Sequence, residues 1–246
     1  MTNLYSLDLI KNIYKKPNFS SEITSQIIYG ERYKILKKNK DWVKIKTSFD
    51  NYTGFINKNK HTKFFKPTHK CYKLKTRVFH KKKTKKKQEF LPFNSRIEIK
   101  KNKGGFAEFE KGKYVKINDL KKINFKEKNF FKILNKFTGC RYLWGGKTFK
   151  GIDCSALIQM FYFFNNRFFP RDTRDQIKVV HKKKSLKSFN RGDIIYWKGH
   201  VAVCIDKQKL IHAYGPKKKV LIMNIKNTIK RIEDTAHLKV KKISKI

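Results

Sequence analysis

The first half of the chain alternates short apolar runs with Lys, Asn and Gly, and it shows no helical period longer than two turns. Runs of this length, bounded by turn-forming residues, are typical of β-strands. The pattern therefore predicts an all-β region from Met1 to about Lys122.

This β region repeats itself. IYGERYKI at 28–35 aligns with PFNSRIEI at 92–99, and WVKI at 42–45 aligns with FAEF at 106–109. The repeat predicts two copies of one small barrel, and one continuous irregular β domain is the alternative. The expected limits of the two barrels are residues 1–65 and 66–122.

The hydrophobic period changes after Ile123. Phe130, Ile133, Leu134 and Phe137 stand at i, i+3, i+4 and i+7, which predicts a helix with one packed face that ends near Gly139. A second helix is expected at 153–164, followed by strands at 193–197, 201–205, 210–213 and 220–225. Helices followed by a meander of strands predict a third domain at residues 123–246 with α+β architecture.

The net charge changes this picture less than its size suggests. Lys and Arg number 62 against 18 Asp and Glu, which gives a formal charge of +44, while 39% apolar residues leave enough side chains for cores. Only nine of the basic residues are Arg, and the Lys are spread over every segment instead of one stripe. We therefore expect no specific nucleic-acid partner. Lys81–Lys87 (KKKTKKK) is expected to be a solvated loop, with a patch for anionic surfaces as the alternative.

The N-terminal residues and the cysteines indicate the compartment. The first sixteen residues lack a basic start followed by a long apolar run, and Asp8 interrupts their apolar stretch, so no signal peptide is visible. No apolar run is long enough for a membrane span. We expect a cytoplasmic protein, in which the four cysteines stay reduced.

Cys154 lies where a Gly-rich loop, WGGKTFKGI, turns into an apolar helix. Asp153 can cap this helix, which puts the Cys154 sulfur at the positive end of the helix dipole. That position is expected to lower the pKa of the thiol, as a nucleophile requires. The alternative is a small apolar side chain that fills helix packing.

A thiolate that attacks a carbonyl needs an imidazole to form an ion pair with it and to protonate the leaving group. His200 heads the strand HVAVCID, and His212 follows in KLIHAYG. If residues 201–213 form a hairpin with its turn near 206–209, His212 returns to the end where His200 lies and can orient it. A zinc site formed by Cys154, His200 and His212 is the alternative, but nothing in the sequence supplies a fourth ligand, so we expect no metal and no cofactor.

Six ordered blocks resemble one enzyme family, the NlpC-type, papain-like cell-wall cysteine peptidases. The resemblance covers about residues 125–225, and the preceding β repeats resemble bacterial SH3-like domains, the first copy more closely than the second. It implies an α+β protein with two SH3-like barrels before a papain-like catalytic domain. The blocks are RYLWGG at 141–146, GIDCSAL at 151–157, PRDT at 170–173 with Gln176, RGDI at 191–194, HVA at 200–202 and IHA at 211–213.

The resemblance implies a role for each site residue. Cys154 corresponds to the nucleophile, His200 to the base and His212 to the residue that orients it. Tyr142 and the backbone N–H of Cys154 would stabilise the oxyanion. The substrate-binding residues implied are Tyr142, Asp153, Ser155 and Thr173, with Asp153 facing a free amine, although helix capping by Asp153 is an alternative that is compatible with this role.

Members with paired SH3-like domains resemble enzymes that trim murein peptides. The resemblance implies hydrolysis between γ-D-glutamate and the diamino acid of peptides with a free N-terminal L-Ala, in recycling of the cell wall. The positive surface would then attract an anionic peptide. The alternatives are hydrolysis or acyl transfer on intact peptidoglycan or another amide.

Overall fold

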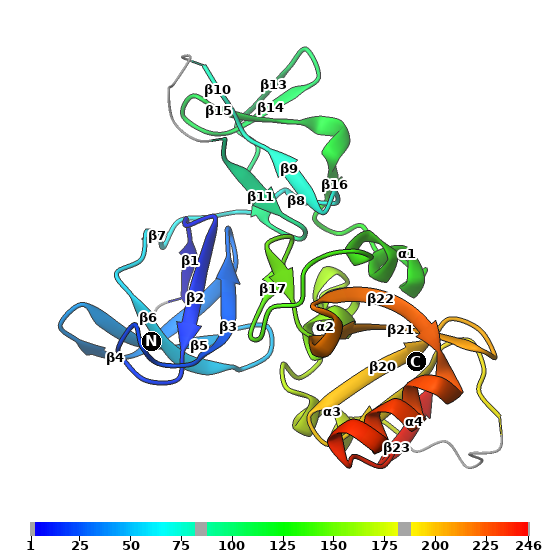
Figure 1. The fold of residues 1–246 in the computed structure, drawn as a ribbon. Helices are drawn as coiled ribbons and strands as arrows, with labels where there is room; N and C mark the ends of the chain where they lie inside the picture. Colours follow the sequence, from blue (N-terminus) through cyan, green and yellow to red (C-terminus); the bar gives the residue numbers. More distant parts are fainter. Residues whose placement is uncertain (1–2, 82–87, 182–187, 246) are drawn as a thin grey trace. The chain divides into compact units, whose positions relative to one another are not determined.

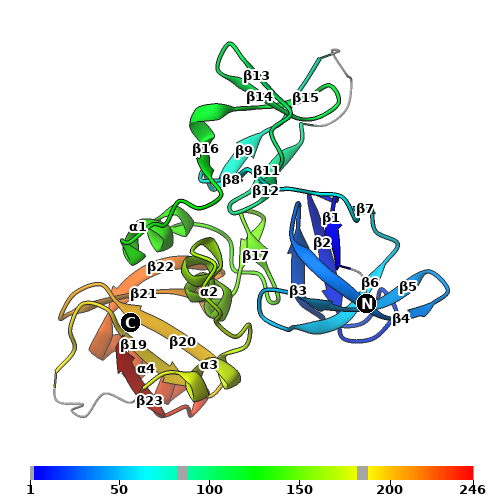
Figure 2. The ribbon, with the colours of Figure 1, turned by 180° about the vertical axis from the view of Figure 1, so that it is seen from behind.

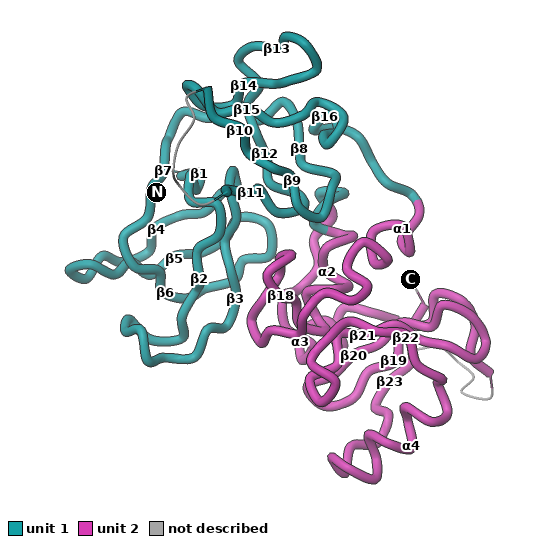
Figure 3. Tube along the Cα trace, turned by 45° about the horizontal axis from the view of Figure 1, so that its top comes forward, with its two compact units in different colours: residues 1–128, 163–166 teal, residues 129–162, 167–246 magenta. Residues whose placement is uncertain are grey.

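The computed structural model describes residues 3–81, 88–181 and 188–245 (Figure 1). Most of the expected lysine-rich loop, residues 82–87, lies outside them. Contacts divide the chain into two compact units (Figure 3), one of residues 1–128 and 163–166 and the other of residues 129–162 and 167–246. The expected boundary at 122/123 falls inside the first unit, and the limits of the three domains remain a prediction.

The first unit begins with a seven-stranded antiparallel sheet in the order β3-β2-β6-β5-β4-β1-β7 (Figure 1). Alternate residues point inward, so Ile13, Ile27, Ile45 and Ile56 are fully buried in one core. Gly30 ends β3 with a φ of +73°, a value that glycine adopts without strain. The strands are β1 Asn3–Ser6, β2 Ile10–Tyr14, β3 Ile23–Ile28, β4 Arg32–Asn39, β5 Trp42–Thr47, β6 Thr53–Asn57 and β7 His61–Thr62.

The second β region forms three small sheets, and its strand pairing follows that of the first. β14 pairs with β13 and β15 as β5 pairs with β4 and β6, and β8 pairs with β12 and β16 as β1 pairs with β4 and β7. This pairing supports a second SH3-like barrel, which stays a prediction. The strands are β8 His69–Cys71, β9 Lys75–Arg77, β10 Phe79–His80, β11 Phe90–Pro92, β12 Arg96–Ile97, β13 Lys101–Lys103, β14 Phe106–Glu110, β15 Lys113–Lys116 and β16 Leu120–Lys122. The 3-10 turn η1 spans Ile117–Asp119.

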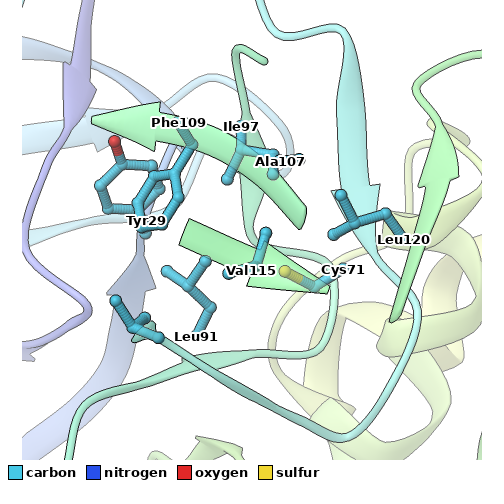
Figure 4. Packing of buried hydrophobic residues seen from close by; sticks show 9 residues of the cluster. Tyr29, Cys71, Leu91, Ile97, Ala107, Phe109, Val115 and Leu120 are labelled. Carbon is cyan, nitrogen blue, oxygen red and sulfur yellow. The ribbon is translucent and has the colours of Figure 1, made fainter. Parts of the chain in front are cut away.

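Tyr29 of the first β region belongs to the core of the second (Figure 4), and Leu7 and Leu9 pack against that core. Tyr29 is 1% exposed and packs edge-on against Phe109, with ring centroids 5.5 Å apart. Leu91, Ala107 and Val115 belong to the same cluster and are fully buried. The two β regions therefore share apolar packing within one unit.

The second unit has the α+β order that the sequence predicts, with five strands in the order β22-β21-β20-β19-β23 (Figure 2). Four of these strands and the second helix lie within a residue of their expected positions. The first helix is shorter than expected, since its α-helical part ends at Leu134 and a 3-10 turn continues to Phe137. The sequence analysis did not anticipate α3, α4 or β23. The elements are α1 Phe130–Leu134, η2 Asn135–Phe137, β17 Lys147–Thr148, β18 Gly151–Ile152, α2 Cys154–Phe164, α3 Thr173–Val179, β19 Asp193–Trp197, β20 His200–Cys204, β21 Lys209–Tyr214, η3 Gly215–Lys217, β22 Lys219–Asn224, α4 Ile225–Ala236 and β23 Lys242–Lys245.

Helix α4 packs on one face of this sheet. Ile225 and Ile232 of the helix are buried with Ile195 and Ala202 of the strands. Burial of these aliphatic side chains fixes the strands that carry the histidines, at roughly 25 cal/mol for each Å² of apolar surface removed from water. Among the described residues, no helix is long and apolar enough to cross a membrane.

Candidate active site

Cys154 is the first residue of α2, as the sequence predicts. Oδ1 of Asp153 accepts a hydrogen bond of 2.8 Å from the backbone N–H of Ala156, which caps the helix. The hairpin of β17 and β18 delivers the chain to this point, because Lys147 pairs with Ile152 just before Asp153. The Cys154 side chain is 5% exposed at the start of the helix.

The two histidines meet as the predicted hairpin requires. Asp206 forms the turn between β20 and β21, where its side chain accepts hydrogen bonds from the N–H groups of Gln208 and Lys209. Nε2 of His200 lies 3.0 Å from Nδ1 of His212. This contact involves Nε2 of His200 and not Nδ1, the other ring nitrogen.

His212 is held on its other side as well. Its Nε2 lies 3.3 Å from Sδ of Met223, and its ring stacks on Tyr214 at 4.6 Å with an interplanar angle of 11°. The residue is fully buried. His212 is therefore fixed by packing, and it can fix the ring of His200 in turn.

The thiol of Cys154 lies against the backbone on both sides of His200. Sγ is 3.9 Å from the carbonyl oxygen of Gly199, and the backbone N–H of Val201 donates to the sulfur. The start of α2 and the start of β20 thus converge at one point. The structure brings together Cys154, His200 and His212, although they are up to 58 residues apart in the sequence.

The expected low pKa of Cys154 is wrong in its direction. Burial raises the pKa of the thiol to about 12, and the negative charge of Asp153 adds to this. The N–H of Val201, the hydroxyl of Thr173 and the charge of Arg171 act in the opposite direction but do not outweigh burial. Removal of water destabilises the thiolate by more free energy than the positive end of the helix dipole stabilises it. The resting side chain is therefore a neutral thiol.

The histidines are neutral for the same reason. Burial lowers the pKa of His200 to about 4, and burial together with the neighbouring His200 lowers the pKa of His212 to about 3. Each imidazole can therefore accept a proton at neutral pH. The resting pair consists of a thiol and an imidazole, and a proton must move between them before the sulfur can attack.

Arg171 is the site residue for which the sequence analysis assigned no role. It is 2% exposed, and its Nη2 and Nη1 lie 2.6 and 3.0 Å from Oδ2 and Oδ1 of Asp153. Oδ2 also accepts the N–H of Gly145 at 3.0 Å. Both carboxylate oxygens of Asp153 are thus occupied by a buried, bidentate ion pair and by backbone donors.

The remaining expected residues lie close to this ion pair. Oγ of Ser155 donates to Asp153 at 3.1 Å and accepts from Nη1 of Arg171 at 3.0 Å. Thr173 begins α3 and hydrogen-bonds the thiol of Cys154. Contact of any of these residues with a substrate stays a prediction.

Tyr142 lies in the same unit, next to η3. Its backbone N–H donates to the carbonyl of Lys218 at 2.9 Å, and a Cβ placed on Gly215 would contact its ring at 3.5 Å. Burial is the main reason why the pKa of the phenol is raised above its usual value of 10, and the neighbouring Cys154 and Asp153 contribute. The hydroxyl therefore stays protonated and can donate a hydrogen bond.

Gln176 supports the site from α3. Its Nε2 donates to the carbonyls of Ser155 and Pro170 at 3.0 and 2.9 Å, and the residue is fully buried. The signal for Arg171 and Gln176 was present, because both belong to the block PRDT at 170–173 with Gln176, which is one of the six that carry the family resemblance. Their contacts could not be read from the sequence, since they join segments far apart in it.

In the part of the chain that the structure describes, three or more His, Cys, Asp or Glu side chains nowhere gather as a metal-binding group. The groups that the site does bring together are a thiol, two imidazoles and hydrogen-bond donors.

Comparison with known families agrees with the division of the chain. The model of the NlpC/P60 family matches residues 139–238, which include every candidate residue discussed above. The model of the bacterial SH3 domain matches residues 8–61, which is the first barrel only. The expectation of two SH3 domains is supported for one of them.

Two bacterial relatives match most of the chain. A dipeptidyl-peptidase 6 from Lysinibacillus sphaericus is 23% identical over 86% of this chain and 87% of its own. A gamma-D-glutamyl-L-lysine dipeptidyl-peptidase from Bacillus subtilis (strain 168) is 23% identical over 84% of this chain and 77% of its own. The crystal structure of an NlpC/P60 family protein from Bacillus cereus ATCC 10987 shares the fold, with a TM-score of 0.82 and 17% identity over 99% of both chains.

Proposed function

This chain carries an NlpC/P60 peptidase domain at residues 139–238 behind a bacterial SH3 domain, and from that premise we propose a cysteine endopeptidase of murein peptides. It cleaves the bond between γ-D-glutamate and the diamino acid of peptides that begin with a free L-Ala. The observation that carries the proposal is the contact of Cys154 with the backbone around His200, whose Nε2 lies 3.0 Å from Nδ1 of His212. The relative from Bacillus subtilis, named for the γ-D-glutamyl-L-lysine bond, supports the substrate class.

The first chemical step transfers a proton and forms a bond. Nδ1 of His200 accepts the proton of the Cys154 thiol, and the sulfur attacks the γ-carbonyl carbon of D-glutamate. The carbonyl π electrons move to its oxygen. The backbone N–H of Cys154 and the hydroxyl of Tyr142 donate to this oxyanion, and the raised pKa of Tyr142 keeps its proton in place for that purpose.

Collapse of this intermediate breaks the amide bond. His200 returns its proton to the nitrogen of the leaving diamino acid, which departs as a neutral amine and leaves a thioester on Cys154. His200 then deprotonates a water molecule, which attacks the thioester. The products are the L-Ala-D-Glu acid and the free thiol, and His212 holds the His200 ring throughout.

The environment of Asp153 favours a second candidate substrate. Selection of a free N-terminal amine by this carboxylate would have to occur beside Arg171, which already neutralises it at 2.6 Å. Because Arg171 already neutralises the carboxylate of Asp153, the site does not require a substrate with a free amine. The alternative is therefore an NlpC-type hydrolase or acyltransferase that acts on intact peptidoglycan or another amide.

One experiment separates the two candidates. The purified protein is incubated with L-Ala-γ-D-Glu-meso-diaminopimelate and with its N-acetylated form, and release of the diamino acid is followed by mass spectrometry. Cleavage of only the free amine supports the peptide-trimming enzyme, whereas equal cleavage of both supports the alternative. If neither peptide is cut while Cys154 reacts with iodoacetamide, the murein-peptide proposal is wrong.

A further inference from the structure

A cavity lies in the second β region, in the sheet of β10, β15, β14 and β13. It has a volume of about 540 Å³, which is within the range of small-ligand sites. Its lining comes from residues 80–81, 101, 108, 111–112 and 114, and none of these belongs to the peptidase site. The proposed function leaves this cavity unexplained.

Strand alternation explains why charged and aromatic side chains line this cavity. Ala107, Phe109 and Val115 face the apolar core, so Glu108 and Tyr114, which alternate with them, face away from it. Glu108 stands opposite Tyr114 in the ladder of β14 and β15. The outer face of the sheet is therefore available for a ligand.

Three lysines line the cavity together with Glu108 and Tyr114. Lys101 stands opposite Glu108 in the ladder of β13 and β14, so the two side chains lie on the same face. Lys81 donates its backbone N–H to the carbonyl of Gly112 at 2.9 Å, which brings it to the turn that contains Lys111. Lys81, Lys101 and Lys111 are all exposed.

The carboxylate of Glu108, the acidic group at the cavity, already accepts two hydrogen bonds. The carboxylate of Glu108 accepts the N–H of Gly112 at 2.8 Å and the hydroxyl of Tyr114. Within the described ranges, none of the ammonium groups of Lys81, Lys101 and Lys111 has a carboxylate within 4.0 Å. The hydrogen bond from Gly112 is the main cause of the lowered pKa of this carboxyl group, and the charges of Lys101 and Lys81 help to lower it. One negative charge therefore faces three positive charges at this cavity.

We propose that this cavity binds a sugar unit of an anionic polysaccharide. Lys81, Lys101 and Lys111 contact the negative groups, and the ring of Tyr114 packs against the sugar. An aromatic ring suits the flat apolar face of a sugar, and ammonium groups on flexible stems suit carboxylate or phosphate groups at variable positions. The site would hold the enzyme on an acidic polymer independently of catalysis.

The test uses three polymers that separate charge from sugar. Binding is measured in about 0.15 M NaCl, where contacts between distant surface charges are largely screened. Polygalacturonate carries both carboxylates and sugar rings, poly-L-glutamate carries carboxylates alone, and dextran is a neutral sugar polymer. We expect polygalacturonate to bind at least about tenfold more tightly than either of the others.

Two variants with the same loss of charge locate the site. Lys81→Gln/Lys101→Gln/Lys111→Gln should weaken binding of polygalacturonate by about tenfold or more. The matched control Lys16→Gln/Lys37→Gln/Lys38→Gln removes three exposed lysines of the first barrel and should change it less than about twofold. Both variants leave residues 82–87 unchanged, and unchanged thermal unfolding shows that both are folded.

Several results would overturn the proposal. Equal weakening by the two triple variants would show that only net charge matters. Binding of poly-L-glutamate as tight as that of polygalacturonate would remove the role of the sugar, and equally tight binding of dextran would remove the role of the lysines. Absence of binding to polygalacturonate would exclude the site altogether.

Discussion

Single residues around Cys154 are fixed by contacts of different kinds. Asp153 is held by an ion pair and by backbone donors, His212 by stacking and burial, and Cys154 by its place in the first turn of a helix. Each contact removes rotational freedom from a group that has to meet the others within hydrogen-bond distance. The site is therefore pre-formed in the second unit.

Removal of the reacting groups tests their roles one by one. We expect Cys154→Ala and His200→Ala to abolish turnover, because nucleophile and base act as one pair. His212→Ala should leave residual activity, about 1–10% of the original, since it only orients His200. Hydrolysis of the murein tripeptide is the measurement, with circular dichroism to confirm folding. Turnover by Cys154→Ala would exclude the mechanism.

The protonation states predict a specific pH profile. Because burial lowers the pKa of His200 to about 4, the neutral imidazole that accepts the thiol proton persists well below pH 6.5. The value of kcat should stay level from about pH 8 down to about pH 5 and fall as the pH approaches 4. An acidic limb centred near pH 6.5 would show instead that His200 titrates as it does in water.

The ion pair of Arg171 and Asp153 predicts a non-additive effect on stability. Arg171→Met leaves an unpaired buried carboxylate and should lower the free energy of unfolding by about 3–5 kcal/mol. The double variant Arg171→Met/Asp153→Asn removes both charges and should regain part of this loss. Urea unfolding measures both, and a double variant no more stable than Arg171→Met would contradict the coupling.

At the scale of elements, the hairpin of β17 and β18 places the start of α2. Gly146 lies in the loop before it, where its carbonyl accepts the N–H of Asp153 at 3.2 Å and Nη2 of Arg171 at 3.4 Å. A Cβ at this position would come 2.5 Å from the carbonyl oxygen of Gly151. The close approach of two backbones, and not a special turn, requires glycine here.

Gly146→Ala should therefore displace the hairpin from the helix start. We expect a loss of about 1–3 kcal/mol in the free energy of unfolding and a clear loss of activity. Gly139→Ala is the control in the same unit, because its φ of +78° is strained for alanine while no atom lies within 4 Å of the added Cβ. The control should lose about 1 kcal/mol and keep its activity. Equal activity of both variants would contradict the role of the loop.

At the scale of the whole molecule, repulsion between positive charges is the main electrostatic effect on the folded state. A formal charge of +44 on 246 residues repels itself in the folded state more than in an extended chain. The described surface pairs join only a few of these charges, and exposed pairs of this kind contribute little. The fold therefore has to tolerate this repulsion through its apolar cores.

Salt should relieve this repulsion. Raising NaCl from about 0.05 to about 0.5 M shortens the screening length to well below 10 Å and should raise the melting temperature. The same change should lower kcat/KM for an anionic peptide, because long-range attraction is screened. Differential scanning calorimetry and steady-state kinetics measure the two effects. A melting temperature that falls with NaCl would show that attractive charge pairs outweigh the repulsion.

Some features of this protein follow from local sequence. The periods of apolar residues predicted the strands that became β19–β22 and the helix that became α2, because burial of one face is a local requirement. The spacing of His200 and His212 around a turn at Asp206 predicted their contact, since hairpin geometry depends on few residues. Cys154 at the start of α2 followed from the capping residue before it.

Other features were decided only by the tertiary structure. The partner of Asp153 was hidden because Arg171 comes from a segment 18 residues further along the chain, and only the folded chain brings the two charges within 2.6 Å. The direction of the pKa shift of Cys154 depends on how completely the fold removes water from the sulfur, and no local pattern reports this quantity. The cavity of the second β region likewise required the register that joins three strands. The local period determined the elements, and long-range packing determined the chemical environment of each side chain.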